Sequence, residues 1–209
     1  HELPRLTVLN PHKLAPVVAV EQARKEVEQM STRCEVVLDG LRTCLTGKVT
    51  EAIENDIFHA EEELDILQHE VSQFLGIVMT TPLPSDVANR ARMLLRVADE
   101  LESVSDDVAA LMKLFIRMRK ANLKLSESSQ AELLNLHDMC RTFAQTVCEA
   151  FRQGKIHAMD LLNHIHSDAT AITARVKEIR SQQLTRMADH DPTLNPINTV
   201  VILDMLNLY

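Results

Sequence analysis

Two pairs of acidic residues have a spacing that could hold a metal ion. Glu61 and Asp65 are four residues apart, and Glu102 and Asp106 repeat this spacing further along the chain. On an α-helix, side chains four residues apart lie on one face. If two such faces meet, four carboxylates converge, and oxygen clusters of this type bind iron, manganese, magnesium or calcium. The spacing therefore predicts a metal site at Glu61, Asp65, Glu102 and Asp106, holding a divalent ion or an iron cluster.

A solvated acidic face explains the same spacing without a metal. The chain has 30 acidic residues among 209, so several such pairs arise by chance, and Glu35 with Asp39 is a third. Crowded carboxylates also repel each other and take up protons when no cation neutralises them. His69, four residues after Asp65, is a weaker candidate ligand. The Glu-x-x-His pairs of a ferritin-like di-iron bundle are absent from the sequence.

Long helices are expected to position these residues. The chain has only four glycines, seven prolines, five phenylalanines, one tyrosine and no tryptophan, a composition that disfavours β-sheets. Between Val20 and Phe115, apolar residues recur at alternating steps of three and four, which is the period of helices packed in a bundle. The pattern predicts three helices there, separated at Gly47 and at Thr80–Pro84, and it starts again near Leu133.

A weak internal repeat indicates that six helices form two related units. Gly47 and Gly154, each followed by lysine, stand at corresponding corners between helices, 107 residues apart. We therefore expect an all-α fold of two tandem three-helix bundles, each running up, down and up. The bundles are expected at residues 16–122 and 123–209, after an extended linker over residues 1–15. The sixth helix is expected to be truncated at the end of the sequence.

Charge and hydropathy exclude several functional classes. The net charge is −8 and no dense cluster of Lys and Arg appears, so no nucleic-acid partner is expected. The four cysteines lack Cys-x-x-Cys spacing and are interpreted as reduced core residues. No apolar run approaches the roughly 18–20 residues that a membrane helix needs. No phosphate-binding loop, nucleophile elbow or His-Glu-x-x-His motif is present, so we do not expect an enzyme.

The acidic motifs resemble those of the PhoU family. The stretch Asp99–Val108 is similar to that family's third-helix signature, Asp-Leu-Glu-Arg-Ile-Gly-Asp, with Ser103 and Ser105 in place of the Arg and the Gly. The stretch Glu61–Leu67 resembles the acidic motif of the family's second helix. The resemblance implies a fold of two three-helix bundles, and some members of the family hold multinuclear iron clusters on such acidic pairs.

Within this family, the chain is similar to the C-terminal cytoplasmic PhoU-like domain of bacterial sodium/phosphate cotransporters. Leu9–Met30 resembles the stretch that joins the last membrane helix to the first bundle, and Asn195–Tyr209 resembles the final helix. The chain starts at His1 without an initiator Met, as expected for a piece without its membrane part. The resemblance implies a regulatory or structural domain at the cytoplasmic face of the bacterial inner membrane, as part of an integral membrane protein. Its expected partners are the transporter's own membrane domain and further copies in a homo-oligomer.

Two alternatives stay open at this point. A free-standing PhoU-type regulator of phosphate signalling would share the same motifs and would bind a transporter ATPase or a histidine kinase. A helical bundle that serves only protein–protein contact would need no ligand at all. No residue pattern in the sequence forms a phosphate pocket, so the connection with phosphate rests on the resemblance.

Overall fold

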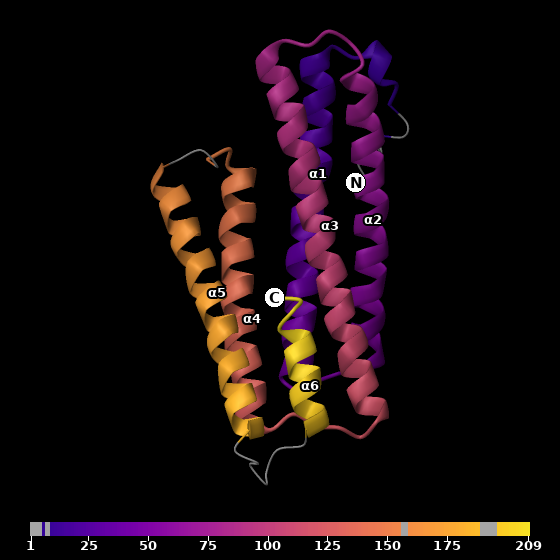
Figure 1. Ribbon diagram of the computed structural model, residues 1–209. Coiled ribbons are helices and arrows are strands. Elements are labelled where there is room, and N and C mark those ends of the chain that lie inside the picture. The colour runs from indigo at the N-terminus through magenta and orange to yellow at the C-terminus, as the bar shows by residue number, and fades with distance from the viewer. Residues whose placement is uncertain (1–5, 7–8, 156–158, 189–195) are drawn as a thin grey trace. The chain divides into compact units, whose positions relative to one another are not determined.

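The computed structural model describes residues 6, 9–155, 159–188 and 196–209. Within them the chain is all-helical, which confirms the predicted fold class (Figure 1). A short 3-10 helix, η2 (Pro11–Lys13), precedes the α-helices. These are α1 (Pro16–Leu45), α2 (Glu51–Val78), α3 (Ser85–Lys120), α4 (Glu127–Arg152), α5 (Met159–Ala188) and α6 (Pro196–Met205).

Local residue types explain several helix ends. Pro16 opens α1, because a proline in the first turn loses no helical hydrogen bond. Gly47 follows α1 with φ of 81°, and Gly154 follows α4 with φ of 66°, a left-handed conformation that glycine adopts without strain. The hydroxyl of Ser126 caps α4 by accepting a hydrogen bond from the backbone N–H of Ser129 at 3.2 Å. The two glycine corners of the predicted repeat therefore have the same backbone conformation.

The beginning of the chain is partly folded. Leu6 is buried, and Pro11–Lys13 forms the 3-10 helix η2 within the stretch predicted to be an extended linker, residues 1–15. Residues 1–5 and 7–8 of this stretch lie outside the described part of the chain. The function of the stretch as a linker to a membrane part stays a prediction.

The chain forms two compact units. Unit 1 contains His1–Val36 and Phe58–Asp106, and unit 2 contains Val37–Ile57 and Asp107–Tyr209. The boundaries fall inside α1, α2 and α3, so each of these long helices contributes to both units. This grouping differs from the division between residues 122 and 123, which stays a prediction.

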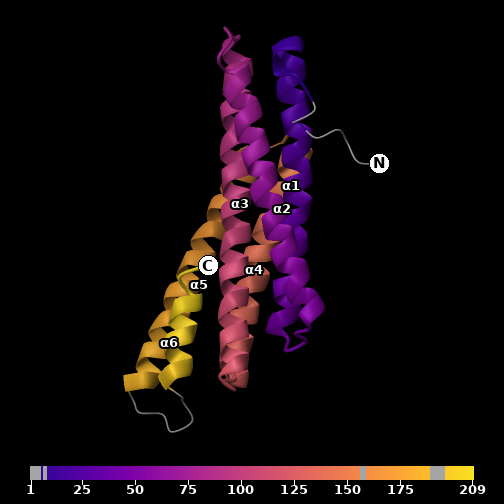
Figure 2. The ribbon, with the colours of Figure 1, turned by 90° about the vertical axis from the view of Figure 1, so that its right-hand side faces the viewer.

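Unit 1 contains the first part of α1, most of α2 and the first part of α3. These segments run side by side (Figures 1 and 2). Their apolar residues are buried at the alternating steps of three and four that predicted a bundle. This core includes Val20, Val27, Met30, Leu64, Leu67, Val71, Phe74, Leu75, Val87, Leu94 and Leu101.

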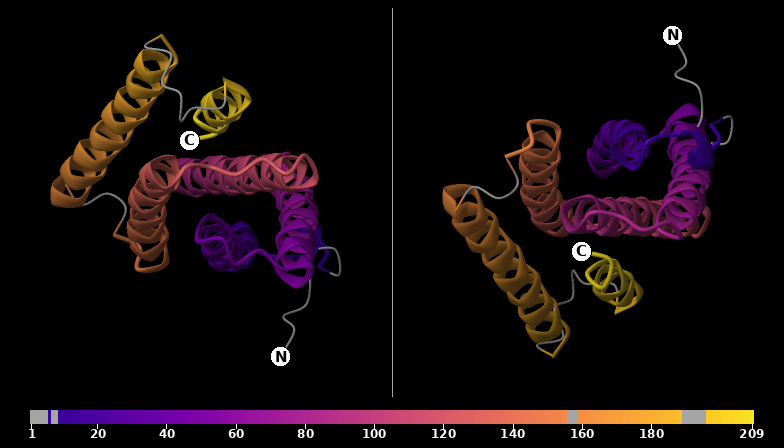
Figure 3. Two further views of the ribbon diagram at one scale, coloured as in Figure 1. Left: turned by 90° about the horizontal axis from the view of Figure 1, so that it is seen from below. Right: turned by 90° about the horizontal axis from the view of Figure 1, so that it is seen from above.

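Unit 2 contains the last turns of α1, the first turns of α2, the end of α3, and all of α4, α5 and α6. The helix α5 packs against α4, and α6 packs against α5. Figure 2 shows α5 and α6 side by side, and Figure 3 shows α4, α5 and α6 from below and from above, coloured from orange to yellow. Its core includes Leu38, Leu41, Leu45, Ile57, Met112, Leu133, Leu136, Phe151, Ile179, Ile202, Met205 and Leu206.

The close approach of α1 and α2 in unit 2 depends on Gly40. A Cβ atom at this position would lie 3.1 Å from Cγ1 and 3.3 Å from Cδ1 of Ile57. A side chain at position 40 would therefore have to displace Ile57. Gly76 in α2 differs, because a Cβ atom there would meet nothing within 4 Å.

No disulfide joins the four cysteines, all of which the structure describes. Cys34, Cys44 and Cys148 are buried, as predicted for core residues, and Cys140 is half-buried. Burial raises the pKa of the Cys140 thiol to about 11, so this thiol stays protonated at neutral pH.

Candidate functional site

Three of the four predicted metal ligands interact electrostatically in unit 1. The pKa of Glu102 on α3 is raised, first by partial burial, then by the negative charges of Asp106 and Asp65, and to a smaller extent by that of Asp99. Asp65 belongs to α2, so the acidic faces of α2 and α3 lie close enough for their charges to interact. Glu61, the fourth predicted ligand, is not among the groups that raise this pKa.

Amide side chains of α2 form hydrogen bonds with polar residues around these carboxylates. The side-chain amide of Gln68 on α2 donates a hydrogen bond to Oδ1 of Asp99 on α3 at 2.6 Å. His69 is exposed, and its Nε2 atom lies 2.8 Å from the amide nitrogen of Gln73 on the same helix. His69, the weaker candidate ligand, therefore already has a hydrogen-bond partner on its own helix.

Metal binding is a separate question from the electrostatic interaction of these carboxylates. Within the part of the chain that the structure describes, no group of three or more His, Cys, Asp and Glu side chains is placed to hold a metal ion. Metal binding by Glu61, Asp65, Glu102 and Asp106, with His69 as a further ligand, stays a prediction of the sequence.

A second polar cluster joins α1 to α4 in unit 2, and we call it the α1–α4 seam. Arg42 forms a bidentate ion pair with Asp138, with distances of 2.6 Å from Nε to Oδ1 and 3.1 Å from Nη2 to Oδ2. Arg141 on α4 pairs in the opposite direction with Asp39 on α1. The hydrogen bonds from Arg42 hold the pKa of Asp138 below its usual range. The two pairs balance two positive charges against two negative ones.

His137 lies at the buried side of the α1–α4 seam, with no exposed surface. Its Nε2 atom is 2.9 Å from the backbone carbonyl oxygen of Leu38 on α1, and its Nδ1 atom is 3.2 Å from the hydroxyl oxygen of Tyr209. A carbonyl oxygen can only accept, so Nε2 carries the hydrogen in this arrangement. The Nδ1 atom of the neutral ring then accepts the hydroxyl hydrogen of Tyr209. The two rings meet edge to face, with centroids 6.0 Å apart.

Burial determines the protonation state of His137. Desolvation lowers its pKa and outweighs the opposing effect of the hydrogen bond to Leu38. The ring is therefore neutral at physiological pH, which agrees with its two hydrogen bonds.

No motif in the sequence marks His137 as a site residue. Its hydrogen-bond partners are 99 and 72 residues away in the sequence, so no local motif connects them. One feature of the sequence could have indicated that His137 is buried. It directly follows Leu136, on the apolar side of the predicted fourth helix. Polar residues at such positions are buried only when they find a partner.

Large apolar side chains remain exposed in unit 2. Leu184 and Met187 are three residues apart near the end of α5, and Ile197 and Val200 have the same spacing at the start of α6, with about half of each side chain accessible. We call these four the α5–α6 apolar residues. Side chains three residues apart lie on one helical face, so each helix presents a short apolar stripe.

Comparison with known proteins gives one match. No protein-family model and no solved structure matches the chain. The chain is similar to "Exocyst complex protein EXO70" from Gibberella zeae, with 25% identity over 127 residues. The matched part is 56% of this chain but only 20% of that protein, so the chain spans a small fraction of this relative's length.

This match corrects the interpretation drawn from the acidic motifs. The assignments to the PhoU family, to a sodium/phosphate cotransporter and to phosphate signalling are wrong, since the similarity found is to an exocyst complex protein. The expected location within an integral transporter of the bacterial inner membrane is wrong on the same finding. The motifs misled because they are short and rich in acidic residues, which amphipathic helices carry on any solvated face.

The structure adds one observation on membranes. Among the described helices, none is both long enough and apolar enough to span a bilayer.

We predict that Glu102→Gln stabilises the chain at neutral pH. The folded-state pKa of Glu102 is raised, so the folded state binds more protons than the unfolded state above the usual pKa of Glu, and stability falls as pH rises there. Removing the charge should raise the free energy of unfolding at about pH 7 by a few tenths of a kcal/mol, and by less at about pH 4. Urea unfolding at both pH values measures this.

The matched control for that experiment is Glu100→Gln, which changes an exposed carboxylate on the same helix. It should have a smaller effect than Glu102→Gln. A lower stability of Glu102→Gln at neutral pH, in the presence of a chelator, would contradict the electrostatic interpretation.

The metal prediction has its own test. If the four carboxylates bind an ion, the purified chain should retain a stoichiometric amount of iron, manganese or zinc, and Asp65→Ala and Glu102→Ala should each lose it. Elemental analysis of the three proteins decides this. Absence of stoichiometric metal from the wild type, or equal metal in all three, would exclude the site.

Proposed function

We propose that this chain is a helical module that assembles with other proteins in a multi-protein complex. The observation that carries the proposal is the similarity to a protein named as part of the exocyst complex. That similarity covers 56% of the chain, so it supports the class of function and not a particular subunit contact.

The exposed side chains of unit 2 support this proposal. The α5–α6 apolar residues give each of two neighbouring helices a short stripe of exposed apolar groups. Burying such groups against another protein is favourable by about 25 cal/mol per Å² of apolar surface. Amphipathic helices dock on one another through anchors at this spacing.

The proposal includes a second copy of the chain among the partners, because the sequence predicts a homo-oligomer. It assigns no catalytic step to the chain, since the sequence contains no recognisable catalytic motif. The proposed role is therefore structural, and affinity depends on the helical surfaces.

The proposal is tested by placing a photo-crosslinking amino acid at position 187 or at position 181. Met187 is one of the α5–α6 apolar residues, and Ser181 is an exposed polar residue of the same helix. Irradiation in cells should join position 187 to one defined protein, which mass spectrometry identifies as a second copy or a distinct subunit. Position 181 should give little product.

A variant strengthens this test. Met187→Glu should abolish the defined product from a crosslinker at position 184, because a charge would be buried at the contact. Its urea unfolding should stay close to that of the wild type, since Met187 is exposed. If positions 187 and 181 give the same diffuse products, and the chain sediments as a monomer, the proposed assembly role is contradicted.

A further inference from the structure

The part of α3 that belongs to unit 1 carries a row of exposed polar residues. They follow one another at alternating steps of four and three, and we call them the α3 stripe: Arg92, Arg96, Asp99, Ser103 and Asp106. Steps of this size keep side chains on one face of a helix. The buried residues of the same part of α3 occupy other positions, so the stripe faces away from the core of unit 1.

The two ends of the α3 stripe carry opposite charges. Arg92 and Arg96 form the basic end, and Asp99 and Asp106 form the acidic end. At a rise of 1.5 Å per residue, the stripe is about 21 Å long. The charges are therefore separated along one face of a single helix.

The basic end of the α3 stripe has no carboxylate partner within the described part of the chain. Nη2 of Arg92 donates to Oδ1 of Asn89, a neutral amide, at 2.8 Å, and Arg96 forms no ion pair there. The neighbouring helix α2 runs in the opposite direction (Figure 1), and its last turns, Val71–Val78, contain no charged residue. The two positive charges therefore stay uncompensated in a single copy of the chain.

The acidic end lacks a cation in the same way. Asp99 accepts a hydrogen bond from the amide of Gln68 at 2.6 Å, which holds this carboxylate but leaves its charge. Asp106 forms no ion pair among the residues that the structure describes. The pKa of the neighbouring Glu102 is raised by partial burial and then by the charge of Asp106. Negative charges thus repel one another at this end of the stripe.

We propose that the α3 stripe is a contact surface between two copies of this chain, which lie antiparallel about a two-fold axis. In this arrangement the basic end of each stripe lies on the acidic end of the other. A two-fold contact uses the same patch on both copies, so the patch must be complementary to itself. A stripe with opposite charges at its two ends meets this condition when the copies are antiparallel. A parallel arrangement would place like charges together.

A second copy is the partner that matches the whole α3 stripe. An acidic protein would match only the basic end, and a metal ion would match only the acidic end. The stripe belongs to unit 1, whereas the α5–α6 apolar residues belong to unit 2. The proposal therefore does not rest on the proposed function, and its failure would leave the crosslinks expected from position 187 unaffected.

The contact is tested first by its dependence on salt, because the charges of the α3 stripe are exposed. Every protein in this experiment carries Met187→Glu, so that the α5–α6 apolar residues do not join the copies, and a chelator keeps metal ions from the acidic end. In sedimentation equilibrium, this parent chain should be largely dimeric at about 50 mM salt and largely monomeric at about 500 mM salt. A parent chain with the same mass at both salt concentrations would overturn the proposal.

Two charge-reversed variants test the antiparallel pairing. Arg92→Glu with Arg96→Glu makes the stripe acidic throughout, and Asp99→Arg with Asp106→Arg makes it basic throughout. Each variant alone should be monomeric at about 50 mM salt, because like charges would face each other. An equimolar mixture of the two should form a heterodimer, since every pair of opposing charges is then restored with its sign reversed.

The charge-reversed variants change exposed residues only, so far-UV circular dichroism and urea unfolding should be close to those of the parent chain. A mixture of folded variants that stays monomeric would overturn the proposal. A variant that dimerises on its own as the parent chain does would overturn it too.

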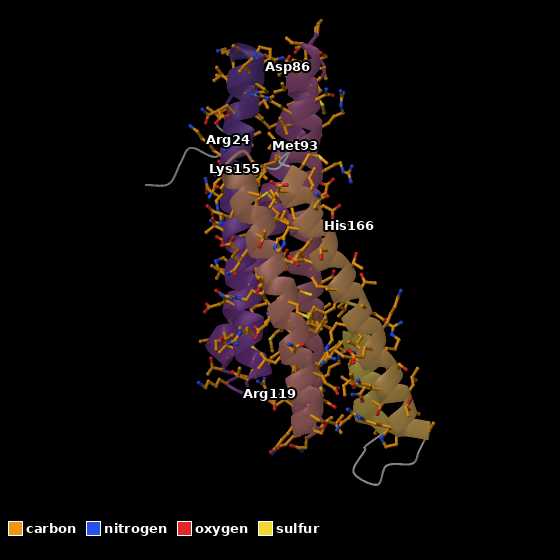
Figure 4. The ribbon with its side chains drawn as sticks, turned by 90° about the vertical axis from the view of Figure 1, so that its left-hand side faces the viewer. Arg24, Asp86, Met93, Arg119, Lys155 and His166 are labelled. Carbon is orange, nitrogen blue, oxygen red and sulfur yellow. The ribbon has the colours of Figure 1, made fainter. Side chains whose placement is uncertain are left out.

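A matched control separates the α3 stripe from the net charge of the chain. Lys155→Glu with Lys177→Glu changes the net charge as much as Arg92→Glu with Arg96→Glu does, but at exposed lysines of unit 2, of which Lys155 is labelled in Figure 4. This control should dimerise like the parent chain. If it loses the dimer as completely as the acidic-stripe variant does, general repulsion explains the loss and the proposal is contradicted.

Discussion

The backbone carbonyl of Leu38 in the middle of α1 accepts a hydrogen bond from the buried ring of His137 on α4. This contact constrains unit 2, because a buried imidazole without partners costs about 1–3 kcal/mol. This hydrogen bond fixes the position of α4 along α1. On the exposed side, the same two helices are joined by the ion pairs Arg42–Asp138 and Arg141–Asp39. The pairs run in opposite directions, so sliding α4 by one helical turn would break both and would leave His137 without the Leu38 carbonyl.

The helix α5 of unit 2 is held on α4 by polar contacts. Glu132 on α4 accepts hydrogen bonds from Gln183 at 3.0 Å and from Arg186 at 2.7 Å, both on α5. Gln183 is almost fully buried, so its amide also specifies how α5 lies on α4. The exposed Leu184 and Met187 are direct neighbours of these two anchored residues in the sequence. The contacts of Glu132 with α5 thus fix the part of α5 that carries Leu184 and Met187. These are two of the apolar side chains through which we propose that the chain binds other proteins.

The helices were predictable because their apolar residues recur at a period that is readable in the sequence, and Gly47 and Gly154 mark two of their ends. The sequence placed Asp65 and Glu102 beside the apolar positions of neighbouring helices, but only the structure shows that their charges interact. The Leu38–His137 contact was not predictable, because it joins residues 99 apart and one partner is a backbone atom. The functional assignment failed for a different reason. Short acidic motifs describe a helical face and do not identify a family, and Ser103 and Ser105 depart from the PhoU signature.

Paired side chains of α1 and α4 fix how these two helices lie against each other in unit 2. The most direct measurement is a charge-swap cycle with Arg42→Asp, Asp138→Arg and the double variant, each unfolded in urea. Each single variant places like charges opposite each other and should be less stable than the wild type. The double variant should be more stable than the sum of the two single effects predicts, as expected for a partly exposed ion pair. If the two single effects simply add, the side chains do not interact across the α1–α4 seam and the claim is contradicted.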